Sequence, residues 1–221
     1  RMGYQPNPMA RGLRTGRSFL IGMLIPNVTY TILPEVIQGV EDGLMGSHFG
    51  LLLGTYNSFA EFKTKVDFLF EKCVDGVIVV PEILPEFHEE YKRISKNIPL
   101  VCVAGSIDKI EFPRAYADGE KIGRIATEYL ISLGHSRIGY VLAGCLSRLT
   151  GYRAALQSHG LAENASWVFM QDKMDLLFGQ WRGISSAERP TGLIFEADMM
   201  AAEFLSIAQS RGFHIPEDIS V

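Results

Sequence analysis

The sequence predicts an α/β protein built from two consecutive units, each a parallel sheet with helices on both faces. Short apolar runs alternate with stretches whose apolar residues recur at helical spacing. This alternation starts after residue 18 and starts again near residue 118. The length of 221 residues suits two small domains, since domains commonly run to roughly 100–200 residues. The composition, 47% hydrophobic and 21% charged, is that of a soluble globular chain.

The first unit is expected to contain four strands and three helices. The run from Phe19 to Ile25 is apolar throughout, as in a strand buried on both faces of a parallel sheet. Further strands are expected at 51–53, 77–80 and 99–103, and helices at 33–44, 59–70 and 85–96. Gly46 is expected to end the first of these helices.

The second unit repeats the pattern. Helices are expected at 122–133, around 149–156 and at 198–211, the first closed by Gly134 and the last by Gly212. Strands are expected at 138–142, 167–170, 193–195 and 219–221. Since a doubly wound sheet rarely ends on an uncovered strand, the second unit is expected to be incomplete at its C-terminal end. The predicted boundaries are 1–18 for an arm, 19–117 for the first Rossmann-like unit and 118–221 for the second.

The charge is unevenly placed along the chain. The first 34 residues hold four arginines and no acidic residue, whereas the remainder holds 17 basic and 25 acidic residues. A basic arm on an acidic body is typical of an appendage that binds a polyanion, although a solvated tail would have the same composition.

The arm carries a short helical pattern. Asn7 is a good N-cap, Pro8 suits the first helical position, and Gly16 would end the turn. A helix this short is not stable alone in water and would be ordered only against a partner. Its exposed face would offer an apolar wedge among cations, which suits a widened minor groove, through Ala10, Arg11, Leu13 and Arg14.

Residues 4–13 match the pattern Y-x-P-N-x-x-A-R-x-L and so resemble the hinge of the lactose-repressor (LacI/GalR) family. The resemblance continues to the chain end through Asp75-Gly76, Gly134-His135, Arg148 to Tyr152 and Ile215 to Val221. It implies a periplasmic-binding-protein-like core that forms a homodimer, binds a small effector between its lobes and orders or disorders the hinge. Contacts of Asn7, Ala10, Arg11, Leu13 and Arg14 with operator DNA are implied, although Leu13 could instead pack against the core.

The resemblance also implies an effector site, by position. Arg148 matches an arginine that grips the ligand, and a guanidinium suits sugar hydroxyls or a carboxylate. The other implied contacts are Asn27, Tyr30, Ile32, Leu33, Asp118 and Asp198. Alternatives stay open, because Asp118 and Asp198 could cap the helices that follow them, and Ile32 and Leu33 could pack in the core.

Three departures from the family pattern stand out. Ala197 replaces the usual Asn before Asp198, and the loop before Arg148 is shorter than usual. The family's helix-turn-helix reader and its C-terminal portion have no counterpart in this sequence.

No catalytic motif is present. The sequence has no P-loop, G-x-G-x-x-G, G-x-S-x-G or H-E-x-x-H pattern, and its five histidines and three cysteines lack nucleophile or metal spacing. We therefore expect a non-enzymatic protein without cofactor or metal, and the resemblance implies a cytoplasmic repressor whose effector is a sugar or sugar derivative. The alternatives are a solute-binding protein of a transport system and, less well supported, a sugar-processing enzyme. The residues upstream of Arg1 would separate the first two, by a helix-turn-helix or by a signal sequence.

Overall fold

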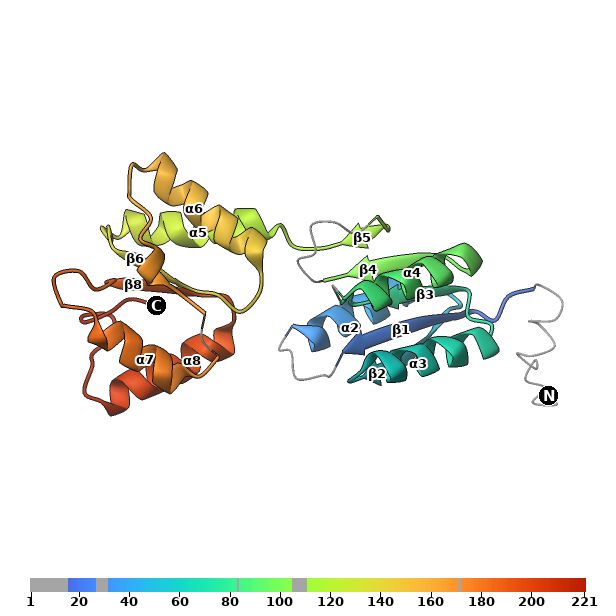
Figure 1. Ribbon diagram of the computed structural model, residues 1–221. Coiled ribbons are helices and arrows are strands. Elements are labelled where there is room, and N and C mark those ends of the chain that lie inside the picture. The colour runs from blue at the N-terminus through green and yellow to red at the C-terminus, as the bar shows by residue number, and fades with distance from the viewer. Residues whose placement is uncertain (1–15, 27–31, 83, 105–110, 171) are drawn as a thin grey trace. The chain divides into compact units, whose positions relative to one another are not determined.

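The computed structural model divides the chain into two compact units, Arg1–Tyr116 and Ala117–Val221 (Figure 1). The structure describes residues 16–26, 32–82, 84–104, 111–170 and 172–221. No helix in these ranges is long and apolar enough to cross a membrane.

Unit 1 is built on a parallel five-stranded sheet in the order β2-β1-β3-β4-β5. Its strands are β1 (Leu20–Pro26), β2 (Gly50–Tyr56), β3 (Gly76–Val79), β4 (Leu100–Val103) and β5 (Arg114–Ala115). The strand β1 lies between β2 and β3, with Ile21 opposite Leu51 on one side and Gly76 on the other. Met23, Leu24 and Ile25 in β1 are completely buried, as the apolar run predicted.

Helices cover both faces of this sheet (Figure 1). One face packs against α3 (Phe59–Glu71) and α4 (Pro85–Asn97) through an aromatic cluster that includes Phe62, Phe87 and Tyr91. The other face packs against α2 (Leu33–Leu44), whose Leu33 lies with Met23, Ile25 and Val80. Ser58 caps α3 by accepting the Glu61 N–H, while Pro85 occupies the first turn of α4.

Unit 2 holds a parallel three-stranded sheet in the order β7-β6-β8. Its strands are β6 (Ile138–Val141), β7 (Val168–Phe169) and β8 (Gly192–Phe195), and Ser220 forms a single parallel bridge to Gly192. One face is covered by α5 (Gly119–Ser132) and α6 (Leu146–Ser158), and the other by α7 (Met174–Gly183) and α8 (Asp198–Ser210). Both sheets thus confirm the predicted α/β class with parallel strands and helices on both faces.

Three details differ from the sequence expectations. The helix α7 was not predicted, although Met174, Leu177, Phe178 and Trp181 form its buried stripe. The strand β5 was not predicted either, because it has only two residues. The strand expected at 167–170 is a short 3-10 turn, Ala165–Trp167, followed by the two residues of β7.

Candidate functional site

The carboxyl ends of the parallel strands are where α/β sheets present ligand-binding residues. In unit 1 this edge is followed by Ile32 and Leu33, which lead into α2. The Ile32 side chain is 52% exposed, whereas Leu33 is 1% exposed and packs in the core against Met23 and Ile25. Asn27 and Tyr30 lie outside the described residues. Of these four positions, Ile32 is the one that the described part of the chain exposes, whereas Leu33 packs in the core of unit 1.

In unit 2 the carboxyl edge is organised by Glu196, which directly follows β8. One carboxylate oxygen accepts the Ala143 N–H at 2.7 Å and the Cys145 N–H at 3.0 Å. The other accepts the Tyr140 hydroxyl at 3.0 Å. Glu196 is only 9% exposed, and these donors satisfy its buried oxygens. A single side chain therefore joins β6, β8 and the loop that leads into α6.

Burial and the neighbouring Glu196 carboxylate both raise the pKa of Tyr140, with burial the larger cause. The Tyr140 phenol therefore stays protonated and donates to Glu196. Glu196 was not predicted from the sequence. An acidic residue placed directly after the apolar run of β8 was the signal that could have found it.

Arg148 lies in the first turn of α6 and points back to the same edge. Its Nη1 donates to the backbone carbonyl of Glu196 at 2.6 Å. Its Nε is buried and has no hydrogen-bond partner within the described ranges. Arg148 and Glu196 are thus brought together, and the buried Nε–H of Arg148 is a donor without a partner among the described residues.

The position of Arg148 depends on a close approach between α5 and α6. A Cβ added at Gly123 would lie 1.9 Å from the Arg148 carbonyl oxygen, and one added at Gly151 would lie 1.9 Å from the Glu120 carbonyl oxygen. Only glycine allows the two backbones this close, so both residues fix the depth at which α6 sits. The position of Arg148 therefore depends on two glycines that do not themselves line the site.

The two predicted acidic contacts occupy helix starts. Asp118 is the N-cap of α5 and accepts the Lys121 N–H at 3.0 Å. Asp198 is the first residue of α8, and the N-cap before it, Ala197, has no side chain that could cap this described helix. Asp118 is therefore engaged in capping, whereas Asp198 lies at the same edge as Glu196 and is exposed.

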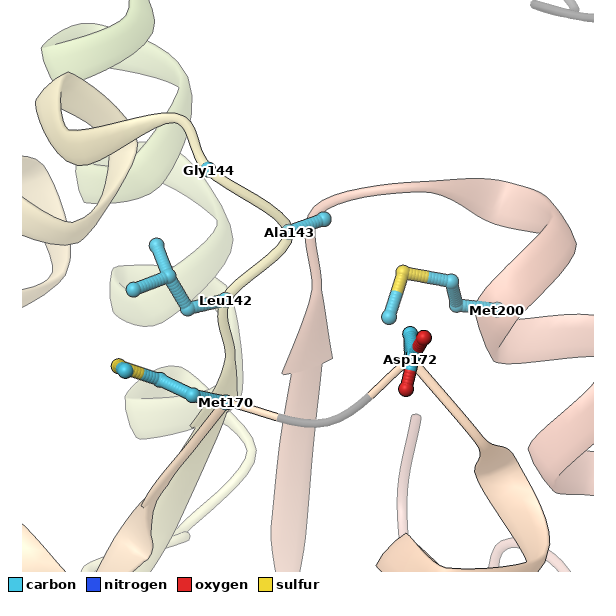
Figure 2. Close-up of a pocket in the computed structure, with 6 residues that line it drawn as sticks. All are labelled: Leu142, Ala143, Gly144, Met170, Asp172 and Met200. Carbon is cyan, nitrogen blue, oxygen red and sulfur yellow. The ribbon is translucent and has the colours of Figure 1, made fainter.

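An open pocket of about 540 Å³ lies at the ends of β6 and β7 (Figure 2). Its lining is mainly apolar, with a single carboxylate, and consists of Leu142, Ala143, Gly144, Met170, Asp172 and Met200. Ala143 belongs to the loop that Glu196 holds, so the network and the pocket share a wall. The arrangement suits binding of a small molecule that has an apolar face and a hydrogen-bonding group. Asp172 was not predicted from the sequence.

No metal centre accompanies this site in the part of the chain that the structure describes. Those residues contain no group of three or more His, Cys, Asp or Glu side chains placed to hold a metal ion. The predicted DNA-contacting residues Asn7, Ala10, Arg11, Leu13 and Arg14 lie outside the described residues.

Comparisons with known proteins cover both units. Residues 127–221 match the model of the periplasmic binding protein-like domain family. The chain is 32% identical to the HTH-type transcriptional repressor PurR of Vibrio campbellii, across all of this chain and 68% of the relative. The corresponding repressor of Vibrio atlanticus is 31% identical over the same shares.

Solved structures give the same picture of the fold. A LacI family transcriptional regulator from Mycobacterium smegmatis superimposes with a TM-score of 0.72 at 26% identity, covering 90% of this chain and 76% of that one. The transcription regulator CcpA of Lactococcus lactis superimposes with a TM-score of 0.78 at 22% identity, covering 91% and 76%.

Proposed function

The chain belongs to the LacI/GalR family of transcriptional repressors, and from this we propose that it is the part of a repressor that senses an effector and controls the DNA-binding arm. The observation that carries the proposal is the alignment over the whole chain with relatives named as repressors. In the proposed cycle, a small molecule binds at the carboxyl edges of the sheets and changes the affinity of the repressor for operator DNA. Such an effector acts only through different affinities for two conformations of the protein.

Arg148 is the proposed polar contact to the effector. Its Nη1 donates to the Glu196 carbonyl, its buried Nε has no partner among the described residues, and its guanidinium provides several donors in a fixed geometry. This favours an oxygen-rich ligand, so a sugar or sugar derivative stays our proposal for the effector class. The apolar lining of the neighbouring pocket adds that the ligand also has an apolar face. Ile32, Asp118 and Asp198, together with Asn27 and Tyr30, remain proposed members of the site, whereas Leu33 supports it through packing.

The proposed partners are operator DNA and a second copy of the chain in the cytoplasm. A homodimer would read a near-palindromic operator, since the symmetry of the site mirrors that of the protein. No enzymatic step is proposed. The alternative of a transport solute-binding protein shares the fold, but the relatives aligned to the full chain are named as repressors.

The test is a binding screen on the chain with ribose, glucose, galactose and gluconate, followed by calorimetry on any compound that raises the melting temperature. Arg148→Ala is expected to weaken binding of the active compound by at least ten-fold, because alanine has no donor to offer the ligand. The matched control is Arg153→Ala, which removes an exposed arginine of the same helix that pairs with Glu163 at 2.7 Å. Equal affinities of the two variants would contradict the role of Arg148.

A further inference from the structure

The point where the N-terminal arm enters unit 1 is held by Ser18, Phe19 and Asp75, which we call the anchor. One carboxylate oxygen of Asp75 accepts the Phe19 N–H at 2.6 Å and the Ser18 hydroxyl at 3.2 Å. The Ser18 oxygen in turn accepts the Leu20 N–H at 3.2 Å. The three residues are half-buried, so these bonds are partly shielded from water.

Backbone bonds fix the anchor to both neighbours of β1. The Asp75 N–H donates to the Leu20 carbonyl at 2.8 Å, and the Gly50 N–H donates to the Phe19 carbonyl at the same distance. The Phe19 ring lies 5.7 Å from the ring of Phe49, centroid to centroid. Residues 18–20 are therefore held between the starts of β2 and β3, at the edge of the sheet opposite the carboxyl ends of its strands.

Phe19 has an unusual backbone conformation. Its φ is +57°, in the left-handed region that residues with a Cβ adopt rarely. Such a conformation persists only where the surroundings enforce it, and here the Asp75 carboxylate bonds the Phe19 N–H. The Asp75 carboxylate thus joins the backbone bonds of Phe19 and Leu20 in holding this conformation at the start of β1.

We propose that Asp75 is a positioning residue for the DNA-contacting arm. The anchor fixes residues 18–20, the point at which the arm joins unit 1, so that a movement of unit 1 is passed to the arm. It also orders residues 18–20 before DNA binds, which lowers the entropy cost of seating the arm. This inference rests on the proposed function, since it assumes that the arm contacts a duplex.

The first experiment measures the anchor in the 221-residue chain. Trypsin cleaves after Arg17, and cleavage there requires residues 18–20 to detach from the sheet. Asp75→Ala is expected to raise the cleavage rate at Arg17 at least ten-fold and to speed hydrogen exchange of the Phe19 amide. Asp75→Asn keeps an acceptor oxygen and is expected to give intermediate rates. The control is Asp42→Asn, which changes an exposed α2 carboxylate that bonds Gln38 and leaves the anchor intact.

The second experiment measures DNA affinity of the full-length protein, using a duplex that the wild type selects from a random library. Asp75→Ala is expected to weaken binding about ten-fold, whereas the slope of affinity against salt concentration stays unchanged because every arginine that meets a phosphate is still present. Asp75→Asn is expected to recover part of the affinity. A general loss of folding would instead lower the melting temperature of the core and the active fraction of protein, and would overturn the positioning role.

The outcomes separate this inference from the proposed function. Wild-type affinity in Asp75→Ala, or an unchanged cleavage rate at Arg17, overturns the positioning role and leaves the repressor assignment in place. A wild-type protein that selects no duplex overturns the proposed function, and the role given to Asp75 falls with it. Weaker binding with an unchanged salt slope and faster cleavage supports the inference.

Discussion

At the scale of single residues, Glu196 shows how one buried carboxylate organises the carboxyl edge of the sheet in unit 2. Its two oxygens have different tasks, because one receives two backbone N–H groups and the other receives a phenol. The backbone carbonyl of the same residue receives Arg148. Removing the side chain would therefore loosen the loop at 143–145, whereas the backbone carbonyl that accepts Arg148 would remain.

Glu196→Gln and Glu196→Ala are expected to behave differently. A glutamine can turn its oxygen to Ala143 and Cys145 and donate its amide to the Tyr140 oxygen, so the three contacts survive. An alanine leaves the buried Tyr140 hydroxyl without this acceptor and is expected to cost about 2–4 kcal/mol of unfolding free energy, against about 1 kcal/mol or less for glutamine. Urea unfolding measures both values.

The control for this pair is Glu203→Ala, which removes an exposed carboxylate from α8. It is expected to change stability by about 0.5 kcal/mol or less. Equal losses for glutamine and alanine at position 196 would show that the charge, and not the hydrogen-bond geometry, holds the loop.

At the scale of elements, replacing glycine by alanine is expected to have opposite effects on stability in different helices of unit 2. A methyl group at Gly123 or Gly151 would lie 1.9 Å from a backbone oxygen, so Gly123→Ala is expected to cost about 3 kcal/mol or more through overpacking. Gly179 in α7 has nothing within 4 Å, and Gly179→Ala is expected to stabilise by about 0.5–1 kcal/mol because alanine favours a helix. Thermal unfolding of the two variants is the measurement, and a Gly123→Ala variant as stable as the wild type would contradict the close approach of α5 and α6.

The same elements show what the sequence could and could not predict. Strand β1 was predictable because a strand buried on both faces is apolar at every position. Helix α7 was missed although its apolar residues have helical spacing, because Gly179 and Gly183 interrupt a ten-residue segment with poor helix formers. A strand as short as β5 is defined by its backbone hydrogen bonds to β4. Such bonds leave no pattern of side chains in the sequence.

The candidate site was predictable only where a residue belongs to a sequence motif with a fixed position relative to a strand. Arg148 follows from its motif, and the structure brings it to the same edge as Glu196. Leu33 shows the limit, because its apolar side chain fits a ligand contact and a core position equally well, and it is 1% exposed. Glu196 and Asp172 could not be predicted in this way, because the residues that they contact or line a pocket with are distant in the sequence.

At the scale of the whole molecule, the sequence divides into a basic arm and an acidic body. The first 34 residues contain four arginines and no acid, and the remaining residues contain 17 basic and 25 acidic side chains. An acidic body is repelled by a duplex, so under the proposed function the attraction within this chain comes from the arm. The repressor account therefore depends on the arm as a DNA contact.

Fluorescence anisotropy of a labelled duplex, selected by the full-length protein and titrated at several salt concentrations, tests this dependence most directly. Deletion of residues 6–17 is expected to weaken binding by at least ten-fold. It is also expected to lower the salt slope by roughly 0.9 for each phosphate that the arm neutralises, because Arg11, Arg14 and Arg17 are removed. An affinity and a salt slope that both match the undeleted protein would contradict the account.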